Sequence, residues 1–146
     1  MKFKKFFATV LSALMLLSCV SLTAFAADAL ALKPSKDTVV RNDTFSVSLP
    51  VSATKSVAIA EITMTYDTTA FEFTGGSSEF SGALINESAP GTIKLSMSDI
   101  TASKSTGNLL VANFRVKGGA SGGSYDFEVV STDSTIKDKD KNVMDS

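Results

Sequence analysis

The chain has 146 residues, 20% of which are charged, and its formal net charge is −1. A balance this close to neutral gives no electrostatic reason to expect binding to nucleic acid or to an anionic membrane surface. The chain contains no histidine and a single cysteine, so Ser-His and Cys-His nucleophilic sites and the usual zinc sites are excluded.

Residues 1–26 have the pattern of a bacterial secretory signal peptide. Three lysines precede an apolar run from Phe6 to Leu17, and Ala24-Phe25-Ala26 offers a cleavage site. The apolar run is too short and wrongly flanked for a stable transmembrane helix. Cleavage after Ala26 would leave 120 residues, 27–146, without cysteine; because three lysines and no acidic residue are lost, the formal charge moves from −1 to −4.

The same segment contains a second processing signal. Leu16-Leu17-Ser18-Cys19 resembles a bacterial lipoprotein box, in which Cys19 would be lipidated and become the new N-terminus. The residues after Cys19 stay apolar through Phe25 and do not open into a polar tether, which favours cleavage after Ala26. We therefore expect a secreted or cell-surface-associated protein, with direct membrane contact only if Cys19 is lipidated.

The stretch from Val57 to Phe73 organises the mature chain. A set of small or apolar residues recurs there at every second position: Ala58, Ala60, Ile62, Met64 and Tyr66. A period of two predicts a β-strand with one face in a core. Asp67 predicts a turn, because its carboxylate can accept a hydrogen bond from the amide two residues on, and a second strand resumes at Phe71.

Other segments repeat this alternation. Leu30 and Leu32 indicate a short first strand before Pro34, and clear strands are predicted over 45–51, 92–99, 109–117 and 125–129, with a short one over 80–85. We expect the charged end, 137–141, to be a solvated hairpin or tail. The predicted core comprises Phe45, Val47, Ile62, Met64, Tyr66, Phe71, Phe73, Leu95, Phe114, Val116 and Phe127.

Seven to nine short strands without a segment of helical period predict an all-β fold. The expected architecture is a two-sheet antiparallel β-sandwich formed by a single domain, residues 27–146. No internal repeat or long linker suggests a second domain.

The acidic residues do not form a recognisable catalytic or metal site. Asp67 and Glu72 are interpreted as turn and surface acids, because nothing near them suggests a cleft. Asp138, Asp140 and Asn142 have the spacing that opens a calcium-binding EF-hand loop, but Val143 stands where that loop needs glycine. We therefore predict a charged turn, no metal and no cofactor in this chain.

Several segments taken together resemble the cohesin domain, a module that binds dockerins on cellulosome-type scaffolds. The segment AIAEITMTYDTTAFEFTG is similar to the third and fourth strands of that family, and GTIKLSMSD to its sixth. TGNLLVANFRVKGGASGGSYDFEV is similar to the eighth and ninth strands, and IKDKDKN to the charged close of the domain. The resemblance implies a jelly-roll topology of about nine strands, in which strands eight, three, six and five present a flat outer face to a dockerin.

Alternation within each strand then selects the residues on that dockerin-binding face. They are Ile59, Glu61, Thr63, Lys94, Ser96, Ser98, Asp99, Leu109, Val111 and Asn113. Where the family has an Asn and an Asp two residues apart, this chain has Ile59 and Glu61. We therefore expect a more apolar contact, in which Ile59, Leu109 and Val111 form one exposed patch.

The resemblance implies a non-catalytic adaptor of the scaffoldin type. Its partner would be a dockerin-bearing secreted enzyme or scaffold protein engaged in polysaccharide catabolism, and calcium would belong to the dockerin. An alternative is a carbohydrate-binding or adhesin β-sandwich on the cell surface. That alternative lacks an obvious aromatic platform, because the mature chain has no tryptophan and both Tyr66 and Tyr125 fall on inward positions.

Overall fold

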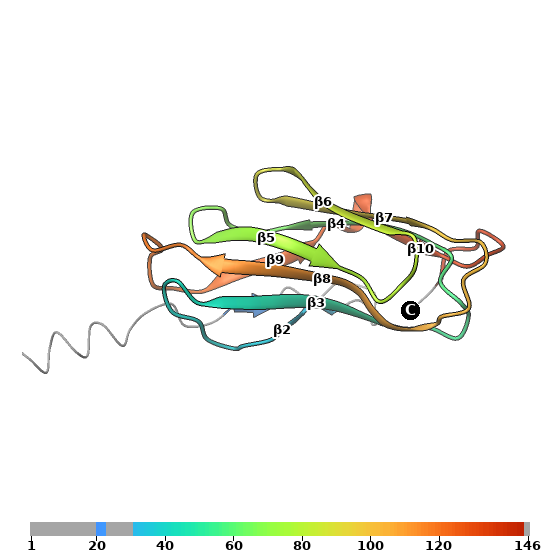
Figure 1. Ribbon diagram of the computed structural model, residues 1–146, viewed down its shortest axis with the longest axis horizontal. Coiled ribbons are helices and arrows are strands. Elements are labelled where there is room, and N and C mark those ends of the chain that lie inside the picture. The colour runs from blue at the N-terminus through green and yellow to red at the C-terminus, as the bar shows by residue number, and fades with distance from the viewer. Residues whose placement is uncertain (1–19, 23–30, 145–146) are drawn as a thin grey trace, which may run out of the picture.

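Alternating residues build nine strands between residues 31 and 144. The computed structural model describes residues 20–22 and 31–144, which form an elongated two-layer sandwich (Figure 1). The strands are β2 Lys33–Pro34, β3 Thr44–Ser52, β4 Ile59–Thr65, β5 Phe71–Ser77, β6 Ala83–Ala89, β7 Thr92–Ser98, β8 Thr106–Val116, β9 Tyr125–Val129 and β10 Thr135–Lys137. A 3-10 helix, η1 Ser131–Asp133, links β9 to β10.

Two sheets make up the sandwich. The larger sheet has the order β1-β9-β4-β7-β6, with β10 also paired to β4, and the smaller sheet has the order β2-β3-β8-β5. Every strand pair formed among β2 to β10 is antiparallel. The prediction of an all-β sandwich of about nine strands in two antiparallel sheets is therefore confirmed.

Strand β1, Val20–Leu22, is the one part of the proposed signal peptide that is described, and it pairs in parallel with β9. The rest of that segment, including Cys19 and the cleavage site after Ala26, lies outside the described residues. Within the described part of the chain, no helix is long and apolar enough to cross a membrane.

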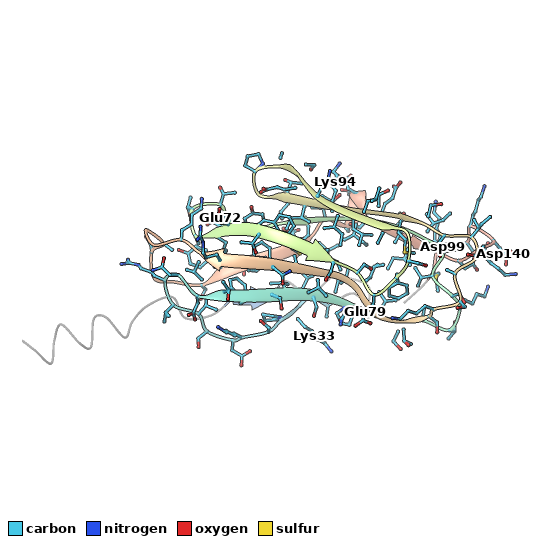
Figure 2. All side chains as sticks on the ribbon, viewed as in Figure 1. Lys33, Glu72, Glu79, Lys94, Asp99 and Asp140 are labelled. Atoms are coloured by element: carbon cyan, nitrogen blue, oxygen red, sulfur yellow. The ribbon has the colours of Figure 1, made fainter. Side chains whose placement is uncertain are left out.

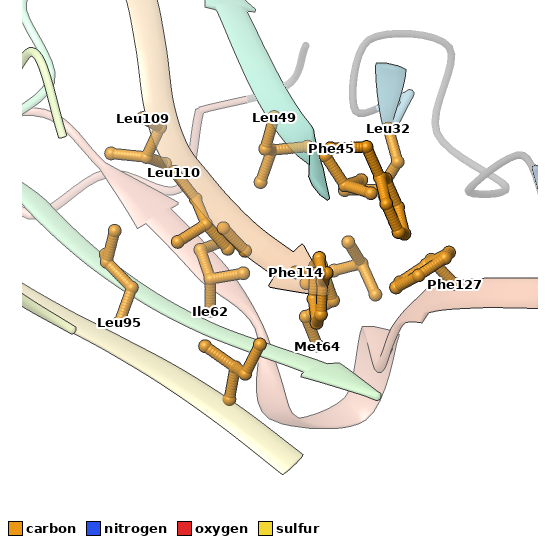
Figure 3. Packing of buried hydrophobic residues seen from close by; sticks show 14 of the residues in the cluster. Leu32, Phe45, Leu49, Ile62, Met64, Leu95, Leu109, Leu110, Phe114 and Phe127 are labelled. Carbon is orange, nitrogen blue, oxygen red and sulfur yellow. The ribbon is translucent and has the colours of Figure 1, made fainter. Parts of the chain in front are cut away.

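An aromatic cluster joins the two sheets. Phe45 and Phe114 come from the smaller sheet and Phe127 from the larger one; the ring centroids of Phe114 and Phe127 are 5.0 Å apart, and those of Phe45 and Phe127 are 6.0 Å apart. Figure 3 shows these rings and the aliphatic side chains between the sheets. Edge-to-face and offset ring pairs at such distances add to the free energy gained by burial.

Most of the predicted core is confirmed. Nine of the eleven residues are buried, whereas Tyr66 and Phe73 are half-buried and pack against the cluster. The turn at Asp67 is also as expected, because the amide of Thr69 donates to the Asp67 carboxylate at 2.7 Å. The short strand predicted over 80–85 is instead β6, which begins at Ala83.

Strand β8 corrects the predicted sheet order. It lies between β3 and β5 in the smaller sheet, so Val111 and Asn113 face away from β4 and β7 and belong to the opposite surface. The strand of the larger sheet that follows along the chain is β9, which pairs with β4 at Met64 and Thr65. Alternation separates inward from outward positions within a strand, but it does not say which sheet receives the strand.

Leu109 departs from its predicted outward position for a second reason, an irregularity in the pairing of β8 with β3. Leu49 pairs with Leu110 and Pro50 pairs with Asn108, which leaves Leu109 as an extra residue in β8. Such a β-bulge reverses the alternation on one side of it. Leu109 and Leu110 are consequently both fully buried, and the expected patch of Ile59, Leu109 and Val111 does not exist.

The charged end is not simply solvated. β10 pairs with β4, and the Asp138 side chain that follows is only 3% exposed. Its carboxylate accepts hydrogen bonds from the backbone amides of Asp140 and Asn142, both at 2.9 Å, and from the Lys55 ammonium at 3.1 Å. The spacing of Asp138, Asp140 and Asn142 resembles the start of a calcium loop, but hydrogen-bond donors surround the Asp138 carboxylate and Lys55 supplies the positive charge.

Candidate binding face

The outer surface of the larger sheet is built from three cross-strand rows. Register places Glu61 between Thr135 of β10 and Ser96 of β7, and Leu84 of β6 lies next to Ser96. The neighbouring rows are Lys137, Ile59 and Ser98 on one side and Thr63, Lys94 and Asn86 on the other. We call this surface the larger-sheet face; it brings together Ile59, Glu61, Thr63, Lys94, Ser96 and Ser98 as the sequence predicted.

Alternation in β7 explains why the centre of the larger-sheet face is polar. Ile93, Leu95 and Met97 are buried, whereas the residues between them point outward and are exposed. Figure 2 shows Lys94 on the side of the molecule opposite to Lys33, which belongs to the smaller sheet. The two outer surfaces of the sandwich therefore carry different strands and different side chains.

Thr63 lies on the larger-sheet face but is only 6% exposed. The segment between β9 and β10 crosses beside it: the amide of Val130 donates to the Thr63 carbonyl at 2.8 Å, and the Thr63 amide donates to Ser134 Oγ at 3.0 Å. The Thr63 hydroxyl also donates to the carbonyl of Asp133 at 3.4 Å. Thr63 therefore holds the η1 segment in place, and its own side chain offers little surface to a partner.

Asp99, at the end of β7, is also engaged within the domain. Its carboxylate accepts hydrogen bonds from the Ser81 hydroxyl and from the hydroxyl and amide of Thr101. These donors, Ser81 first, lower the pKa of Asp99 below its usual value. Asp99 thus ties the β5–β6 loop to the β7–β8 loop at the end of the domain that also carries Asp140 (Figure 2).

A depression lies on the larger-sheet face between β4, β7 and η1. Its volume is about 520 Å³, and the charged side chains that line it are Glu61, Lys94 and Asp133. In residues 31–144 none of these three side chains takes part in a hydrogen bond or ion pair. The depression therefore holds three charges that are available to an external partner.

Leu84 and Asn86 belong to the larger-sheet face but were not predicted from the sequence. Leu84 is 75% exposed, as is Ile100 in the loop after β7. The run Ala83-Leu84-Ile85 has no apolar-polar alternation, so its outward position is not evident locally. The Pro90-Gly91 turn, which makes β6 and β7 a hairpin, is the one signal that points to this pairing.

The β6–β7 hairpin is anchored at that turn. The Tyr66 hydroxyl donates to Glu87, whose carboxylate also accepts from the Gly91 amide at 3.1 Å, and the Tyr66 amide donates to the Gly91 carbonyl at 3.0 Å. Gly91 has φ +82°, and an added Cβ would lie 3.0 Å from the Tyr66 carbonyl oxygen, so this position requires glycine. Burial, reinforced by Glu87, raises the pKa of Tyr66 to about 12. These contacts fix the turn of the hairpin, and pairing with Ser96 places Leu84 on the face.

Comparison with known proteins gives one family and one fold. The model of the cohesin domain family matches residues 30–146, while none of the curated proteins compared with this chain matches it.

Solved cohesin structures are similar in fold. The sixth cohesin of scaffoldin B from Acetivibrio cellulolyticus, solved with a dockerin, has a TM-score of 0.63 and 20% identity, covering 70% of this chain and 82% of that one. A type I cohesin–dockerin complex from Clostridium thermocellum has a TM-score of 0.62 and 15% identity, and the match covers 71% of this chain and 82% of that one. A cohesin module of a family 33 glycoside hydrolase from Clostridium perfringens has a TM-score of 0.64 and 17% identity, and the match covers 80% of this chain and 89% of that one. At these identities the similarity shows the fold alone.

Proposed function

Because the chain belongs to the cohesin domain family, we propose that it is a non-catalytic adaptor that binds a dockerin through the larger-sheet face. The observation that carries this proposal is the composition of that face. It combines a 75% exposed leucine, Leu84, with the unpaired charges of Glu61 and Lys94 on neighbouring strands of one sheet. Protein–protein interfaces typically combine an apolar centre with a polar rim.

The partner would be the dockerin of a secreted polysaccharide-degrading enzyme or of another scaffold protein, and the adaptor would support polysaccharide catabolism. Secretion is supported by the signal pattern of residues 1–26, which would leave 27–146 as the mature domain. Lipid anchoring through Cys19 is the alternative route to the cell surface. We propose that calcium enters the complex with the dockerin and that this chain needs no cofactor.

A carbohydrate-binding or adhesin sandwich is less well supported. Every aromatic side chain in residues 31–144 is buried or half-buried. The Tyr66 ring packs on Phe114 with centroids 5.0 Å apart, and the Tyr125 hydroxyl donates to the carbonyl of Ser121 at 2.7 Å. Neither tyrosine therefore offers a free ring on which a sugar could stack.

A pair of substitutions in β4 tests the proposed face. Ile59 points outward and is half-buried, whereas Ile62 is 1% exposed and points into the core. Ile59→Asp should weaken dockerin binding by more than about 2 kcal/mol while the domain stays folded, because a charge would enter a surface that loses water on binding. Ile62→Asp should unfold the domain.

The measurement is calorimetric titration against a set of purified dockerins, together with thermal melts of both variants. Native protein should bind at least one dockerin and lose it when calcium is chelated. Normal binding by a folded Ile59→Asp variant would move the binding surface elsewhere. If the native domain bound none of the dockerins, the proposed function would be wrong.

A further inference from the structure

The segment that links β9 to β10 gives the larger-sheet face a raised side. β9 pairs with β4 at Met64 and Thr65, and β10 pairs with it from Ile59 to Glu61, so both strands use the same edge of β4. Between them the chain leaves the sheet as η1, in which no residue is buried. Its attachment to the backbone of Thr63 at 2.8 and 3.0 Å fixes Asp133 beside the depression.

Three charges meet in this depression, and their sum is negative. Glu61 projects from β4 and Asp133 from η1, whereas Lys94 projects from β7. A partner that covers the depression would remove water from both carboxylates, which is unfavourable unless the partner supplies positive charge and hydrogen-bond donors. An arginine or lysine side chain meets this requirement, and the guanidinium group can serve two carboxylates at once.

We propose that the depression receives one basic side chain of the dockerin, held between the carboxylates of Glu61 and Asp133. This inference rests on the proposed function, because it names the complementary group on the same partner. Lys94 has the opposite sign from the two carboxylates, so it opposes the incoming cation and limits the affinity of the depression for it. The role of Thr63 is to position Asp133 through the η1 segment.

The sign of the effect at each charged residue tests the proposal. Glu61→Gln and Asp133→Asn should each weaken dockerin binding about three- to tenfold, because each removes a negative charge that pairs with the cation. Lys94→Met keeps the length of the side chain and should strengthen binding about twofold or more, because it removes the opposing charge. Asp140→Asn, which removes the same charge from an exposed loop at the end of the domain, should leave binding unchanged.

The titrations use the secreted domain and the dockerin that binds it most tightly, at low and high salt, with a thermal melt of each variant. The dependence on salt should be smaller in the Glu61→Gln, Asp133→Asn double variant than in the native domain. Replacing the lysines and arginines of that dockerin by glutamate, one at a time, should identify the cation as the residue whose replacement weakens binding most. The Glu61→Lys domain should then bind that dockerin variant more tightly than the native domain does, because the charges are exchanged.

Two results would overturn the inference. Weaker binding by Lys94→Met would show that the depression receives an acidic group. Unchanged binding by both Glu61→Gln and Asp133→Asn would show that it receives no cation. In either case the loss of binding in Ile59→Asp, on the same face, would still support the proposed function, whereas failure of every dockerin to bind the native domain would remove both.

Discussion

The two outer surfaces of the sandwich arise from the same alternation but differ in what they expose. On the larger sheet, Leu84 is exposed and the charged side chains of Glu61 and Lys94 are unpaired. On the smaller sheet, Arg115 is paired with Glu72, with Nε and Oε2 3.1 Å apart. The neighbouring outward rows hold Ser46 with Asn113, and Ser48 with Lys33 and the half-buried Val111. Outward position alone therefore does not mark an interface; the larger sheet differs in presenting a 75% exposed leucine beside two unpaired charges of opposite sign.

The largest effect is expected from a core substitution, because it destabilises both sheets and therefore both outer surfaces. Phe114 belongs to the smaller sheet but packs on Phe127 of the larger one. Phe114→Ala should lower the free energy of unfolding by about 3–5 kcal/mol, from lost burial and the cavity left behind. Phe73→Ala is the matched control: Phe73 is half-buried and should cost less. A denaturant titration decides, and a loss of less than about 1 kcal/mol for Phe114→Ala would contradict its central place in the core.

A pair of charge insertions separates the two surfaces. Leu84→Asp on the larger-sheet face should weaken dockerin binding by about 2 kcal/mol or more, since it places an unpaired charge in a surface that loses water on binding. Asn113→Asp adds the same charge at an exposed position of the smaller sheet and should leave binding unchanged. Calorimetric titration of both variants measures the difference. Equal effects from the two would contradict the assignment of binding to the larger sheet.

The smallest effect concerns Asp138, which belongs to neither surface. Burial by itself would raise the pKa of its carboxyl, but hydrogen bonds from Asn142, Lys55 and Asp140 outweigh it and lower the pKa from 3.8 to about 2. A carboxyl with a lowered folded pKa adds stability above its unfolded pKa and loses it as the pH falls toward the folded value. The contribution of Asp138 should therefore be complete above pH 3.8 and disappear toward pH 2.

Thermal melts of the native domain and of Asp138→Asn across this range check the prediction. The native domain should melt at the higher temperature near neutral pH, and the difference should narrow in acid. Asp140→Asn, in the same loop but with an exposed side chain, should show no such convergence. Dockerin binding at neutral pH should be the same in both variants, and a pH-independent difference for Asp138→Asn would contradict the assigned pKa.

Much of the candidate face could be predicted from single strands. The alternation of β4 and β7 placed Ile59, Glu61 and Lys94 outward, and the structure shows all three on one surface. Thr63 also has the outward parity, but the η1 segment covers it. That cover comes from residues about seventy positions away in the chain, and a strand pattern contains no information about it.

The sequence by itself determined the class of fold, the turn at Asp67 and nearly all of the aromatic core, because a period of two and the hydrogen bond from Thr69 to Asp67 act over a few residues. The tertiary structure decided that β8 belongs to the smaller sheet, that a bulge turns Leu109 inward, and that Leu84 stands exposed beside Ser96. These features depend on hydrogen bonds between strands far apart in the chain. Shifting such a pairing by one residue exchanges the faces of a strand without changing its amino-acid sequence.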